Sequence, residues 1–254
     1  MTYDFSNRCV VVTGGSRGIG RSICEAFAAG GAKVVVNYQS DEDAANITLE
    51  CLEGDGHFVV QADVSNPEGA KKIIEETISL LGGLHIVVNN AGVAIKHAIA
   101  DIGYDEWQTA WQKTIEANLI GPSNVCYCAA RYMMDNGGGR IVNISSRGAF
   151  RGEPDYPGYG ASKAGLNSLS QSLAIALAPH NIFVGVVAPG FVQTDMVKKK
   201  LAGPDGDSIR AQSPLGRVAH PEEVAHAALF LASDGAEFST GTIIDVNGAS
   251  FLRT

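Results

Sequence analysis

Two residues that can exchange a proton stand four positions apart in the sequence Tyr159-Gly160-Ala161-Ser162-Lys163. Side chains at this spacing lie on one face of a helix, so a helix here brings the phenol of Tyr159 and the ammonium group of Lys163 together. A free tyrosine titrates at about pH 10, and a neighbouring cation favours its ionised form. The pair suits general acid and base chemistry, although a Tyr-x-x-x-Lys spacing arises easily by chance among seven tyrosines.

Two further polar residues precede this pair. Ser146 ends the apolar run that begins at Ile141, thirteen residues before Tyr159. Asn118 lies in Glu116-Ala117-Asn118-Leu119, a helical stretch with apolar neighbours. A polar residue in that setting marks either a kink or cap in the helix or a functional position.

Seven runs rich in β-branched residues predict the strands that must position these groups. The runs are almost continuously apolar, which is typical of parallel strands covered by helices on both faces. They occupy residues 9–13, 33–36, 57–60, 85–88, 140–144, 182–187 and 242–246. Helical patterns alternate with them at 18–29, 41–52, 67–81, 160–178 and 221–232. This order predicts an α/β fold, a single Rossmann-type doubly wound domain over residues 1–254 with a mostly parallel seven-stranded sheet.

Two segments do not fit this alternation. Residues 190–217 contain glycines and prolines with little apolar periodicity, and we interpret them as an excursion after the sixth strand. Ligands of such folds bind beyond the carboxyl ends of the strands, so this excursion is a candidate substrate lid. The stretch 104–136 carries Trp107 and Trp111 four residues apart, on a face that suits either the core or a partner subunit.

A glycine-rich turn follows the first strand and precedes the first helical pattern, in the sequence Thr13-Gly14-Gly15-Ser16-Arg17-Gly18-Ile19-Gly20. Glycine permits a tight turn and lets backbone N–H groups and a helix N-terminus approach a pyrophosphate. The spacing differs from the GxGxxG fingerprint, because three residues separate Gly14 from Gly18 and one separates Gly18 from Gly20. A simple strand-to-helix turn is the alternative.

The composition limits which classes of binding partner and which cellular compartment are expected. The formal net charge is −8 and the longest basic run is Lys198-Lys199-Lys200, so neither nucleic acid nor an anionic membrane is expected as a partner. The N-terminus lacks the pattern of a signal peptide, and no apolar run approaches the roughly 20 residues of a membrane span. Five cysteines without a CxxC pair and six dispersed histidines indicate a cytoplasmic protein without a metal site.

Taken in order along the chain, these motifs resemble the short-chain dehydrogenase/reductase family. The glycine turn is similar to the family's TGxxxGxG loop, and Asn89-Asn90-Ala91-Gly92 follows the fourth strand as its NNAG does. Asp63-Val64 follows the third strand, and Pro189-Gly190 with Thr194 follows the sixth. The resemblance covers about residues 5 to 250. In one departure, Asn247-Gly248-Ala249 stands where many members have Asp-Gly-Gly, which leaves the C-terminal turn open.

The resemblance implies a catalytic tetrad of Asn118, Ser146, Tyr159 and Lys163. In this tetrad Tyr159 is the acid and base, while Lys163 stabilises its phenolate and holds the ribose hydroxyls. Ser146, which the spacing to Tyr159 selects over Ser145, donates a hydrogen bond to the substrate carbonyl oxygen. Asn118 orients Lys163 through water. The implied reaction is hydride transfer between a nicotinamide and a substrate carbon, which interconverts a ketone and a secondary alcohol.

The resemblance also implies which residues hold the dinucleotide. Asp63 would address the adenine and Thr194 the nicotinamide carboxamide. Turn building is the alternative for Asn90 and Gly92, and helix capping near Pro67 is the alternative for Asp63. The full predicted set is Gly14, Ser16, Arg17, Gly18, Ile19, Gly20, Asn37, Asp63, Val64, Asn90, Ala91, Gly92, Tyr159, Lys163, Pro189, Gly190 and Thr194.

The end of the second strand favours NADP(H) over NAD(H), although NAD(H) remains possible. An acidic residue there would bind the ribose 2′-hydroxyl and repel a 2′-phosphate, but the sequence is Asn37-Tyr38-Gln39-Ser40. Arg17 offers a cation to the phosphate. We interpret Asp41, Glu42 and Asp43 as residues of a helix start, in which Ser40 and Asp43 form the cap.

The predicted activity is that of a 3-oxoacyl reductase-like enzyme acting on small free 3-oxoesters or polar ketones. An acidic chain would attract an acidic carrier protein only weakly. Arg147 and Arg151 either face a substrate carboxylate or phosphate or are solvated loop charges. A sugar, polyol or other alcohol dehydrogenase of the family is an alternative, as is a non-catalytic nucleotide-binding regulator.

Two further expectations rest on the resemblance alone. The epimerases and dehydratases of the superfamily carry a long C-terminal substrate domain, whereas only seven residues follow Asn247 here. Relatives form homotetramers through a helix pair and the last strand, so a homotetramer, or a homodimer, is expected.

Overall fold

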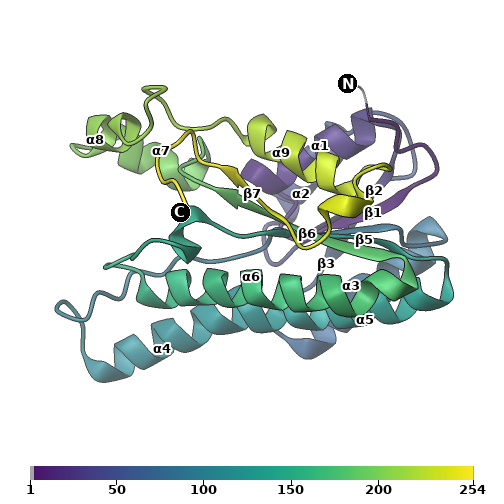
Figure 1. Ribbon diagram of the computed structural model, residues 1–254, viewed down its shortest axis with the longest axis horizontal. Helices are drawn as coiled ribbons and strands as arrows, with labels where there is room; N and C mark the ends of the chain where they lie inside the picture. Colours follow the sequence, from purple (N-terminus) through teal and green to yellow (C-terminus); the bar gives the residue numbers. More distant parts are fainter. Residues whose placement is uncertain (1–2, 254) are drawn as a thin grey trace.

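The computed structural model describes residues 3–253, apart from the side chain of Met196, and forms one twisted sheet flanked by helices (Figure 1). Neighbouring strands all pair in parallel, in the order β3-β2-β1-β4-β5-β6-β7. The strands are β1 Cys9–Val12, β2 Lys33–Tyr38, β3 Phe58–Gln61, β4 Ile86–Asn89, β5 Gly139–Ile144, β6 Ile182–Pro189 and β7 Ile243–Val246. The predicted seven-stranded α/β fold is confirmed.

Helices cover both faces of this sheet. In Figure 1, α1, α2 and α9 lie above it, whereas α3, α5 and α6 lie below it with α4 beneath α6. The helices are α1 Gly18–Ala29, α2 Glu42–Glu50, α3 Pro67–Leu81, α4 Tyr104–Ile115, α5 Gly121–Asp135, α6 Pro157–Leu177, α7 Asp195–Ala202, α8 Gly206–Ala211 and α9 Pro221–Ala232. Within residues 3–253, no helix is both long and apolar enough to span a membrane.

Alternate residues of β1 enter two separate cores, because successive side chains of a strand point to opposite faces. Val10 and Val12 pack into the cluster that includes residues of α1 and α9. Val11 packs into the cluster that includes residues of α3 and α5. All three valines are 0% exposed, which explains why the strand is apolar at every position rather than at every second one.

The helix boundaries follow the sequence closely except at α2 and α6, and α2 covers Glu42–Glu50 instead of the predicted 41–52. α1, α3 and α9 begin and end at the predicted residues. α6 begins at Pro157 instead of Gly160, since the first turn of a helix tolerates the missing N–H of proline. The cap of α2 is Asp41, whose side chain accepts a hydrogen bond from the backbone N–H of Ala44 at 3.0 Å. The predicted cap formed by Ser40 and Asp43 is therefore wrong.

The stretch 104–136 is helical up to Asp135, but a π-helix, Glu116–Ile120 (η1), separates α4 from α5. Such widened turns are rare and occur often at functional sites. Trp107 and Trp111 on α4 stack with ring centroids 5.1 Å apart and are partly buried beside His97. Both tryptophan side chains are thus partly covered by residues of the same chain, such as His97.

The segment 190–217 contains two short helices, α7 and α8, which its weak periodicity did not predict. The stems of this segment are joined by backbone hydrogen bonds. The N–H of Ala219 donates to the carbonyl of Phe191 at 2.9 Å, and the N–H of Gln193 donates to the carbonyl of Ala219 at 2.8 Å. The segment projects from the sheet at upper left in Figure 1, next to the C-terminal end of the chain.

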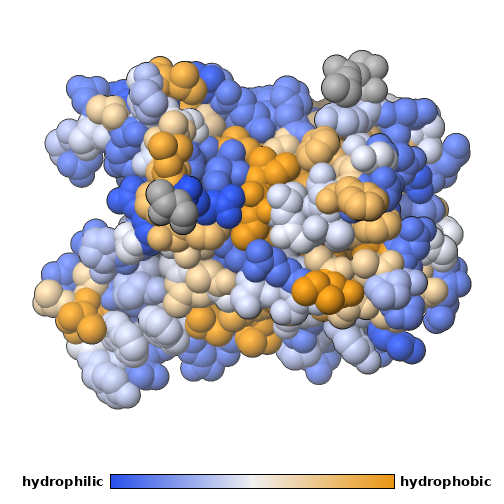
Figure 2. Space-filling view, in the orientation of Figure 1, coloured by the Kyte–Doolittle hydropathy of each residue, from blue (hydrophilic) through white to orange (hydrophobic). Residues whose placement is uncertain are grey.

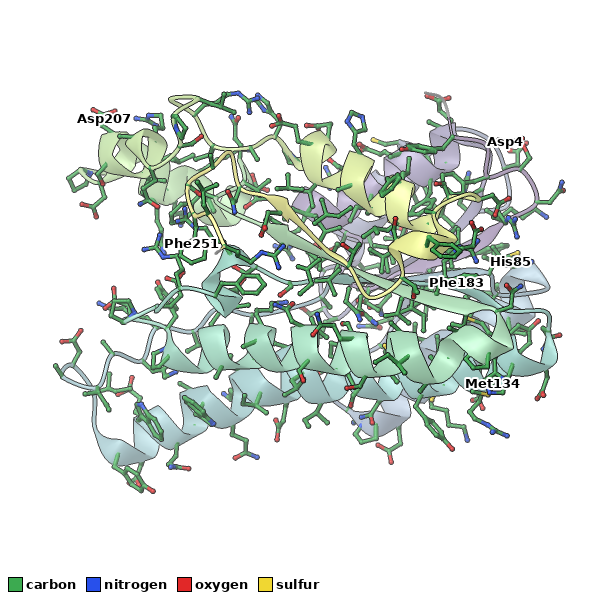
Figure 3. All side chains as sticks on the ribbon, in the orientation of Figure 1. Asp4, His85, Met134, Phe183, Asp207 and Phe251 are labelled. Carbon is green, nitrogen blue, oxygen red and sulfur yellow. The ribbon has the colours of Figure 1, made fainter. Side chains whose placement is uncertain are left out.

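The two ends of the sheet differ in what they carry (Figure 3). His85, Phe183 and Met134 lie at the amino end of the strands, whereas Asp207, in the segment 190–217, and Phe251 lie at the opposite end. The strand order reverses between β1 and β4. The loops after these two strands leave in opposite directions, which opens a crevice at the carboxyl end of the sheet.

Candidate functional site

A cavity of about 1250 Å³ runs along the carboxyl ends of the strands. In Figure 2 the molecule is indented on its left side, between the part that carries α7 and α8 and the part that carries α4. Every residue of the predicted dinucleotide set lines the cavity, as do Ser146, Tyr159 and Lys163. Asn118 does not line it, although its neighbour Ala117 does. One crevice therefore brings together residues that span the chain from Gly14 to Thr194.

The glycine turn after β1 has a backbone that side chains would not permit. Gly14 and Gly18 have φ angles of +61° and +55°, in the left-handed region that favours glycine. A Cβ atom on Gly20 would lie 2.2 Å from the carbonyl oxygen of Gly14. α1 begins at Gly18 without a side-chain cap, so the first N–H groups of the helix are open to an anion. The turn, the open helix end and the long cavity fit the pyrophosphate of a dinucleotide.

Asn90 holds this turn in place from β4. Its side-chain amide donates to the carbonyls of Thr13 and Gly14 at 3.0 and 2.9 Å, and its backbone N–H donates to the hydroxyl of Thr13 at 3.0 Å. Asn90 therefore stabilises a turn, as the alternative interpretation of this residue expected. Its side chain links the two strands at which the sheet order reverses.

Asn37, at the end of β2, is also turned into the fold. Its side-chain oxygen accepts from the N–H of Gly14 at 3.3 Å, and its amide donates to the carbonyls of Val60 and Ala62, both at 3.1 Å. The residue is 1% exposed. Its side chain thereby fixes β1, β2 and β3 relative to one another where they border the cavity.

Arg17 is paired with a carboxylate at the mouth of the cavity. Its Nη2 atom lies 3.0 Å from Oδ2 of Asp41, and the two side chains are 59% and 42% exposed. An exposed pair of this kind contributes little to stability. The guanidinium group of Arg17, which the sequence predicts to bind a 2′-phosphate, is therefore already paired with Asp41, the residue that caps α2.

Asp63 builds a local turn after β3 rather than a helix cap. Its Oδ1 atom accepts from the N–H and the hydroxyl of Ser65 at 2.9 and 2.7 Å, and its Oδ2 atom accepts from Gln39 at 2.7 Å. Burial opposes ionisation, but these hydrogen bonds hold the pKa of Asp63 below its ordinary value. The cap of α3 is Asn66, whose side chain accepts from Glu68, so the capping alternative for Asp63 is excluded.

Tyr159 and Lys163 lie on α6 and face the cavity. Nζ of Lys163 lies 5.9 Å from the centre of the Tyr159 ring and donates to the carbonyl of Ile144 at 2.8 Å. Ser146 lies two residues after the end of β5 and caps a short 3₁₀ turn, Arg147–Ala149 (η2), by accepting from the N–H of Gly148 at 3.0 Å. The end of β5 therefore supplies a hydroxyl near Tyr159 and a carbonyl that holds Lys163.

Burial shifts the titration of both groups. It lowers the pKa of Lys163 from 10.5 to about 8, because a cation loses hydration in a low-dielectric site. Burial also raises the pKa of Tyr159; a hydrogen bond with Ser146 opposes the rise and the charge of Glu153 adds to it. At neutral pH the tyrosine is therefore a neutral phenol and the lysine is mostly charged.

Asn118 is fully buried in the π-helix. Its side chain accepts from the N–H of Val93 at 2.8 Å and donates to the carbonyl of Val93 at 2.9 Å. A Cβ atom on Gly92 would lie 3.0 Å from Oδ1 of Asn118 and 3.5 Å from Nζ of Lys163. Gly92 thus permits the amide and the ammonium group to approach the same point.

The chain is similar to known proteins along nearly its whole length. The model of a family described as Enoyl-(Acyl carrier protein) reductase matches residues 14–249. The chain is 37% identical over 253 residues to a 3-oxoacyl-[acyl-carrier-protein] reductase of Aquifex aeolicus, covering 99% of this chain and 100% of the relative. It is 37% identical over 256 residues to 3beta-hydroxysteroid dehydrogenase 1 of Eggerthella lenta, covering 99% and 97% of the two chains.

A solved structure is similar over the same length. The short-chain type dehydrogenase/reductase from Mycobacterium ulcerans has a TM-score of 0.91 and 32% sequence identity over 98% of this chain and 92% of its own. The chain belongs to the short-chain dehydrogenase/reductase family. It is an enzyme of the oxidoreductase class, as its relatives are.

Some residues of this oxidoreductase's site were not found from the sequence. Ser162 accepts from the Asn118 amide at 3.1 Å and donates to the carbonyl of Tyr159 at 2.8 Å, so it connects the π-helix to α6. Its position within the Tyr-x-x-Ser-Lys run was the only signal. His97 accepts from the N–H of Gly158 at 2.9 Å, and nothing in the sequence pattern indicates that contact.

The two arginines behind Ser146 differ in their surroundings. Arg147 is 5% exposed and bonded to Gln212 and Ser250, each at 2.6 Å. Arg151 lies 3.9 Å from Glu153. Arg147 is therefore a buried residue held by neighbouring segments and not a solvated loop charge.

Proposed function

We propose that this protein is an NADP(H)-dependent oxidoreductase that interconverts a ketone and a secondary alcohol. The observation that carries the proposal is the meeting of Ser146, Tyr159 and Lys163 at one part of a cavity whose other part is the glycine turn of β1. A dinucleotide held by that turn would extend along the carboxyl ends of the strands toward Tyr159. When bound, the nicotinamide supplies or accepts the hydride at the substrate carbon.

The protein's own contribution is proton supply and charge stabilisation. In the direction of reduction, the Tyr159 hydroxyl donates its proton to the substrate oxygen, which becomes the alcohol hydroxyl. Ser146 donates a hydrogen bond to the same oxygen and stabilises its developing negative charge. The ammonium group of Lys163 stabilises the phenolate that Tyr159 leaves behind. The neutral phenol favoured by burial is the form that this direction requires.

Lys163 and Asn118 form the path by which Tyr159 regains a proton. Lys163 has a pKa of about 8, close to neutral pH, so it can release and regain a proton at little cost. Asn118 approaches the Lys163 ammonium group across Gly92, and Ser162 bonds Asn118 to the turn that carries Tyr159. We assign Asn118 the orientation of Lys163, with a water molecule between them.

The preference for NADP(H) rests on the end of β2 and on Arg17. Asn37 is neutral and occupied by backbone contacts, so it does not repel a 2′-phosphate. Arg17 lies at the cavity mouth with more than half of its side chain exposed. A 2′-phosphate would compete with Asp41 for this cation, so the preference should be moderate rather than absolute.

The proposed substrates are small free 3-oxoesters and polar ketones. The relatives include a reductase named for an acyl-carrier-protein substrate and a dehydrogenase named for a steroid, so family membership leaves the substrate open. A carrier protein is acidic and this chain has a net charge of −8, which disfavours their association. Lys199 and Lys200 at the cavity rim are the cations that could offset this.

A panel of carbonyl compounds tests the proposal. NADPH oxidation would be measured with acetoacetyl thioesters, free oxoesters, sugars, steroids and quinones. We expect turnover of free oxoesters, with no more than about a tenfold advantage for a carrier-protein thioester. A carrier-protein substrate preferred by about a hundredfold would instead indicate fatty-acid synthesis, and no turnover of any carbonyl would favour a nucleotide-binding regulator.

We also propose a homotetramer. Large apolar side chains are exposed on α4, α5 and α6, represented by Tyr104, Tyr127 and Ile175. Phe238, just before β7, is fully exposed as well. Two separate apolar surfaces are what a protein with two kinds of subunit contact requires. Light scattering at about micromolar concentration should give four times the monomer mass of 26.6 kDa, and a monomer would exclude this assembly.

A further inference from the structure

Arg147, directly after Ser146, is a buried cation without a carboxylate partner among the described residues. It is 5% exposed, and its Nη1 and Nη2 atoms donate to Ser250 Oγ and Gln212 Oε1, each at 2.6 Å. Buried arginines usually pair with an acid, because desolvating a charge is costly. Among residues 3–253, no ion pair within contact distance therefore fixes its position, and the charge of Glu153 acts on it only from farther away.

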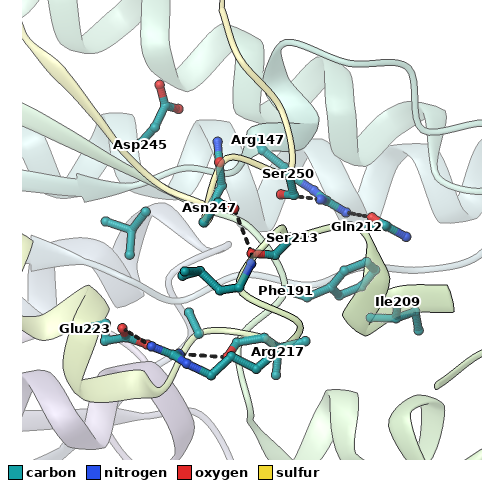
Figure 4. Close-up of a pocket in the computed structure, with 15 residues that line it drawn as sticks. Arg147, Phe191, Ile209, Gln212, Ser213, Arg217, Glu223, Asp245, Asn247 and Ser250 are labelled. Atoms are coloured by element: carbon teal, nitrogen blue, oxygen red, sulfur yellow. Dashed lines mark hydrogen bonds and ion pairs between the residues drawn. The ribbon is translucent and has the colours of Figure 1, made fainter. Parts of the chain in front are cut away.

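Three segments that are distant in sequence meet at this guanidinium group (Figure 4). Gln212 ends the α8 part of the lid segment, and Ser250 belongs to the C-terminal turn after β7. The guanidinium carbon also lies 4.8 Å from the centre of the Phe191 ring, in the stem of the lid. Arg147 thus contacts the lid at both its stem and its far side, and joins it to the turn that follows β5.

Packing between these segments is incomplete. A cavity of about 110 Å³ lies behind the lid, lined by Arg147, Phe191, Ile209, Ser213 and residues of the turn after β7. Polar contacts between the segments border this cavity. Besides the bonds of Arg147, Ser213 donates to the carbonyl of Gly248 at 2.7 Å.

The turn that Arg147 anchors is the one that orients Ser146. The Ser146 hydroxyl accepts from the N–H of Gly148 at 3.0 Å, within the 3₁₀ turn Arg147–Ala149. A displacement of the Arg147 backbone would move Ser146 in the cavity. Arg147 lines both the large cavity and the small one, and its guanidinium group contacts the lid at Gln212 and Phe191.

We propose that Arg147 is a positioning residue that couples the lid to Ser146. With the lid in place, Gln212 and Phe191 hold the guanidinium group and the turn keeps Ser146 aimed into the cavity. When the lid moves away, these contacts are lost, the guanidinium group turns to water and the turn loosens. The proposal rests on the catalytic role assigned to Ser146, and it makes that role depend on lid closure.

One test probes the contact between the lid and the turn by limited proteolysis, without an activity measurement. Gln212 is exposed, so Gln212→Ala should fold normally while removing the acceptor of Arg147. We expect trypsin to cleave the lid at Lys198–Lys200 at least about fivefold faster in this variant, because its open form becomes more populated. Gln193→Ala is the matched control, since Gln193 is an exposed glutamine of the same segment. Equal cleavage of Gln212→Ala and wild type would overturn the proposal.

A second test measures the coupling to Ser146 by steady-state kinetics, once the wild-type protein has been shown to reduce a ketone. Gln212→Ala should raise KM for the ketone and lower kcat, together reducing kcat/KM about tenfold. Arg147→Lys should have a similar effect, because lysine cannot bond two acceptors in a fixed plane and stack on Phe191. The double variant should be no worse than either single variant, because both remove one connection.

The competing role, direct binding of an anionic substrate group by Arg147, gives a different result. In that case Arg147→Lys would impair only substrates with a carboxylate or phosphate, and Gln212→Ala would behave as wild type. That pattern contradicts coupling. A wild-type enzyme without any ketone turnover would instead contradict the proposed function, whereas the proteolysis result would still report on the lid.

Discussion

The two halves of the cleft are held together by different means. The half that faces the glycine turn is fixed by backbone: Gly14 and Gly18 adopt left-handed conformations, and Asn37 and Asn90 bond to main-chain atoms. The half formed by the segment 190–217 has backbone bonds at its stem, but beyond the stem it is held by side-chain contacts beside a small cavity, Arg147 with Gln212 at 2.6 Å among them. Lys200 adds a second tie, with its ammonium group 3.1 Å from the Tyr156 hydroxyl.

This difference indicates which half of the cleft can be altered without disturbing the sheet. A dinucleotide presents the same pyrophosphate in every case, so a backbone cradle tolerates little variation. Substrates differ, and a lid held by a few side chains can be altered by single substitutions without disturbing the sheet. The residues of the lid half are therefore where the substrate preference of this oxidoreductase should reside.

Filling the glycine turn should give the largest effect. In Gly20→Ala the new Cβ would lie 2.2 Å from the carbonyl oxygen of Gly14, so the turn must open and the pyrophosphate contacts are lost. We expect NADPH affinity to fall at least about 100-fold, equivalent to about 2.7 kcal/mol. Isothermal titration calorimetry would measure it. Gly103→Ala, where a Cβ meets nothing within 4 Å, is the control, and an unchanged affinity in Gly20→Ala would contradict the cradle.

Lys163→Met should abolish activity yet stabilise the cofactor-free protein. Lowering a lysine pKa from 10.5 to about 8 corresponds to about 3 kcal/mol, and the lost bond to Ile144 offsets about 1 kcal/mol of it. Urea unfolding at pH 7 should show a gain of about 2 kcal/mol.

The pH dependence of this gain has a defined sign. Below pH 8 both folded and unfolded wild type carry the charge, so the cost of burying it is complete. As the pH rises from about 8 toward 10.5, the folded lysine loses its proton first, and the wild type becomes more stable. The advantage of Lys163→Met should therefore shrink over that range. An advantage that grew with pH would exclude a buried, charged lysine.

The preference between NADPH and NADH tests the role of Arg17, which lies in the glycine turn. The ratio of kcat/KM for NADPH over NADH should exceed about ten, and Arg17→Ala should reduce it by about that factor through NADPH alone. Asp41→Asn keeps an acceptor for the Ala44 N–H but removes the charge beside Arg17, so it should raise the ratio. Equal use of both cofactors by the native protein would refute this assignment.

The smallest effect is expected in the C-terminal turn next to Ser250. Ala249 has a φ of +58°, which costs a residue with a Cβ about 1–2 kcal/mol. Ala249→Gly removes this strain, and the greater freedom of unfolded glycine offsets about half of the gain. A stabilisation of about 0.5 kcal/mol in urea unfolding is expected. Destabilisation would mean that the Ala249 methyl group contributes packing that outweighs the strain.

The sequence predicted the regular parts of the fold because local and long-range signals coincide there. Every apolar run became a strand, since residues such as Val10 and Val11 are buried on both faces of the sheet. The glycine turn was predictable because only glycine tolerates its conformation. The NNAG segment and the Tyr-x-x-x-Lys pair were identified by their order along the chain.

What the sequence did not predict depends on contacts between distant segments. α7 and α8 are short and lack a regular apolar face, so no periodicity indicated them. The cap at Asp41 depends on geometry that three neighbouring acids make ambiguous. The environment of Arg147 is set by Gln212 and Ser250, 65 and 103 residues away, and no local pattern encodes such a meeting.

The measurement that tests the central claim most directly is the comparison of Tyr159→Phe with the wild type in turnover and in NADPH binding. Phenylalanine keeps the ring, so NADPH affinity should change by less than about threefold, whereas loss of the transferable proton should reduce kcat by about 10³-fold or more. Activity within about tenfold of the wild type would contradict the assignment of Tyr159 as the proton donor.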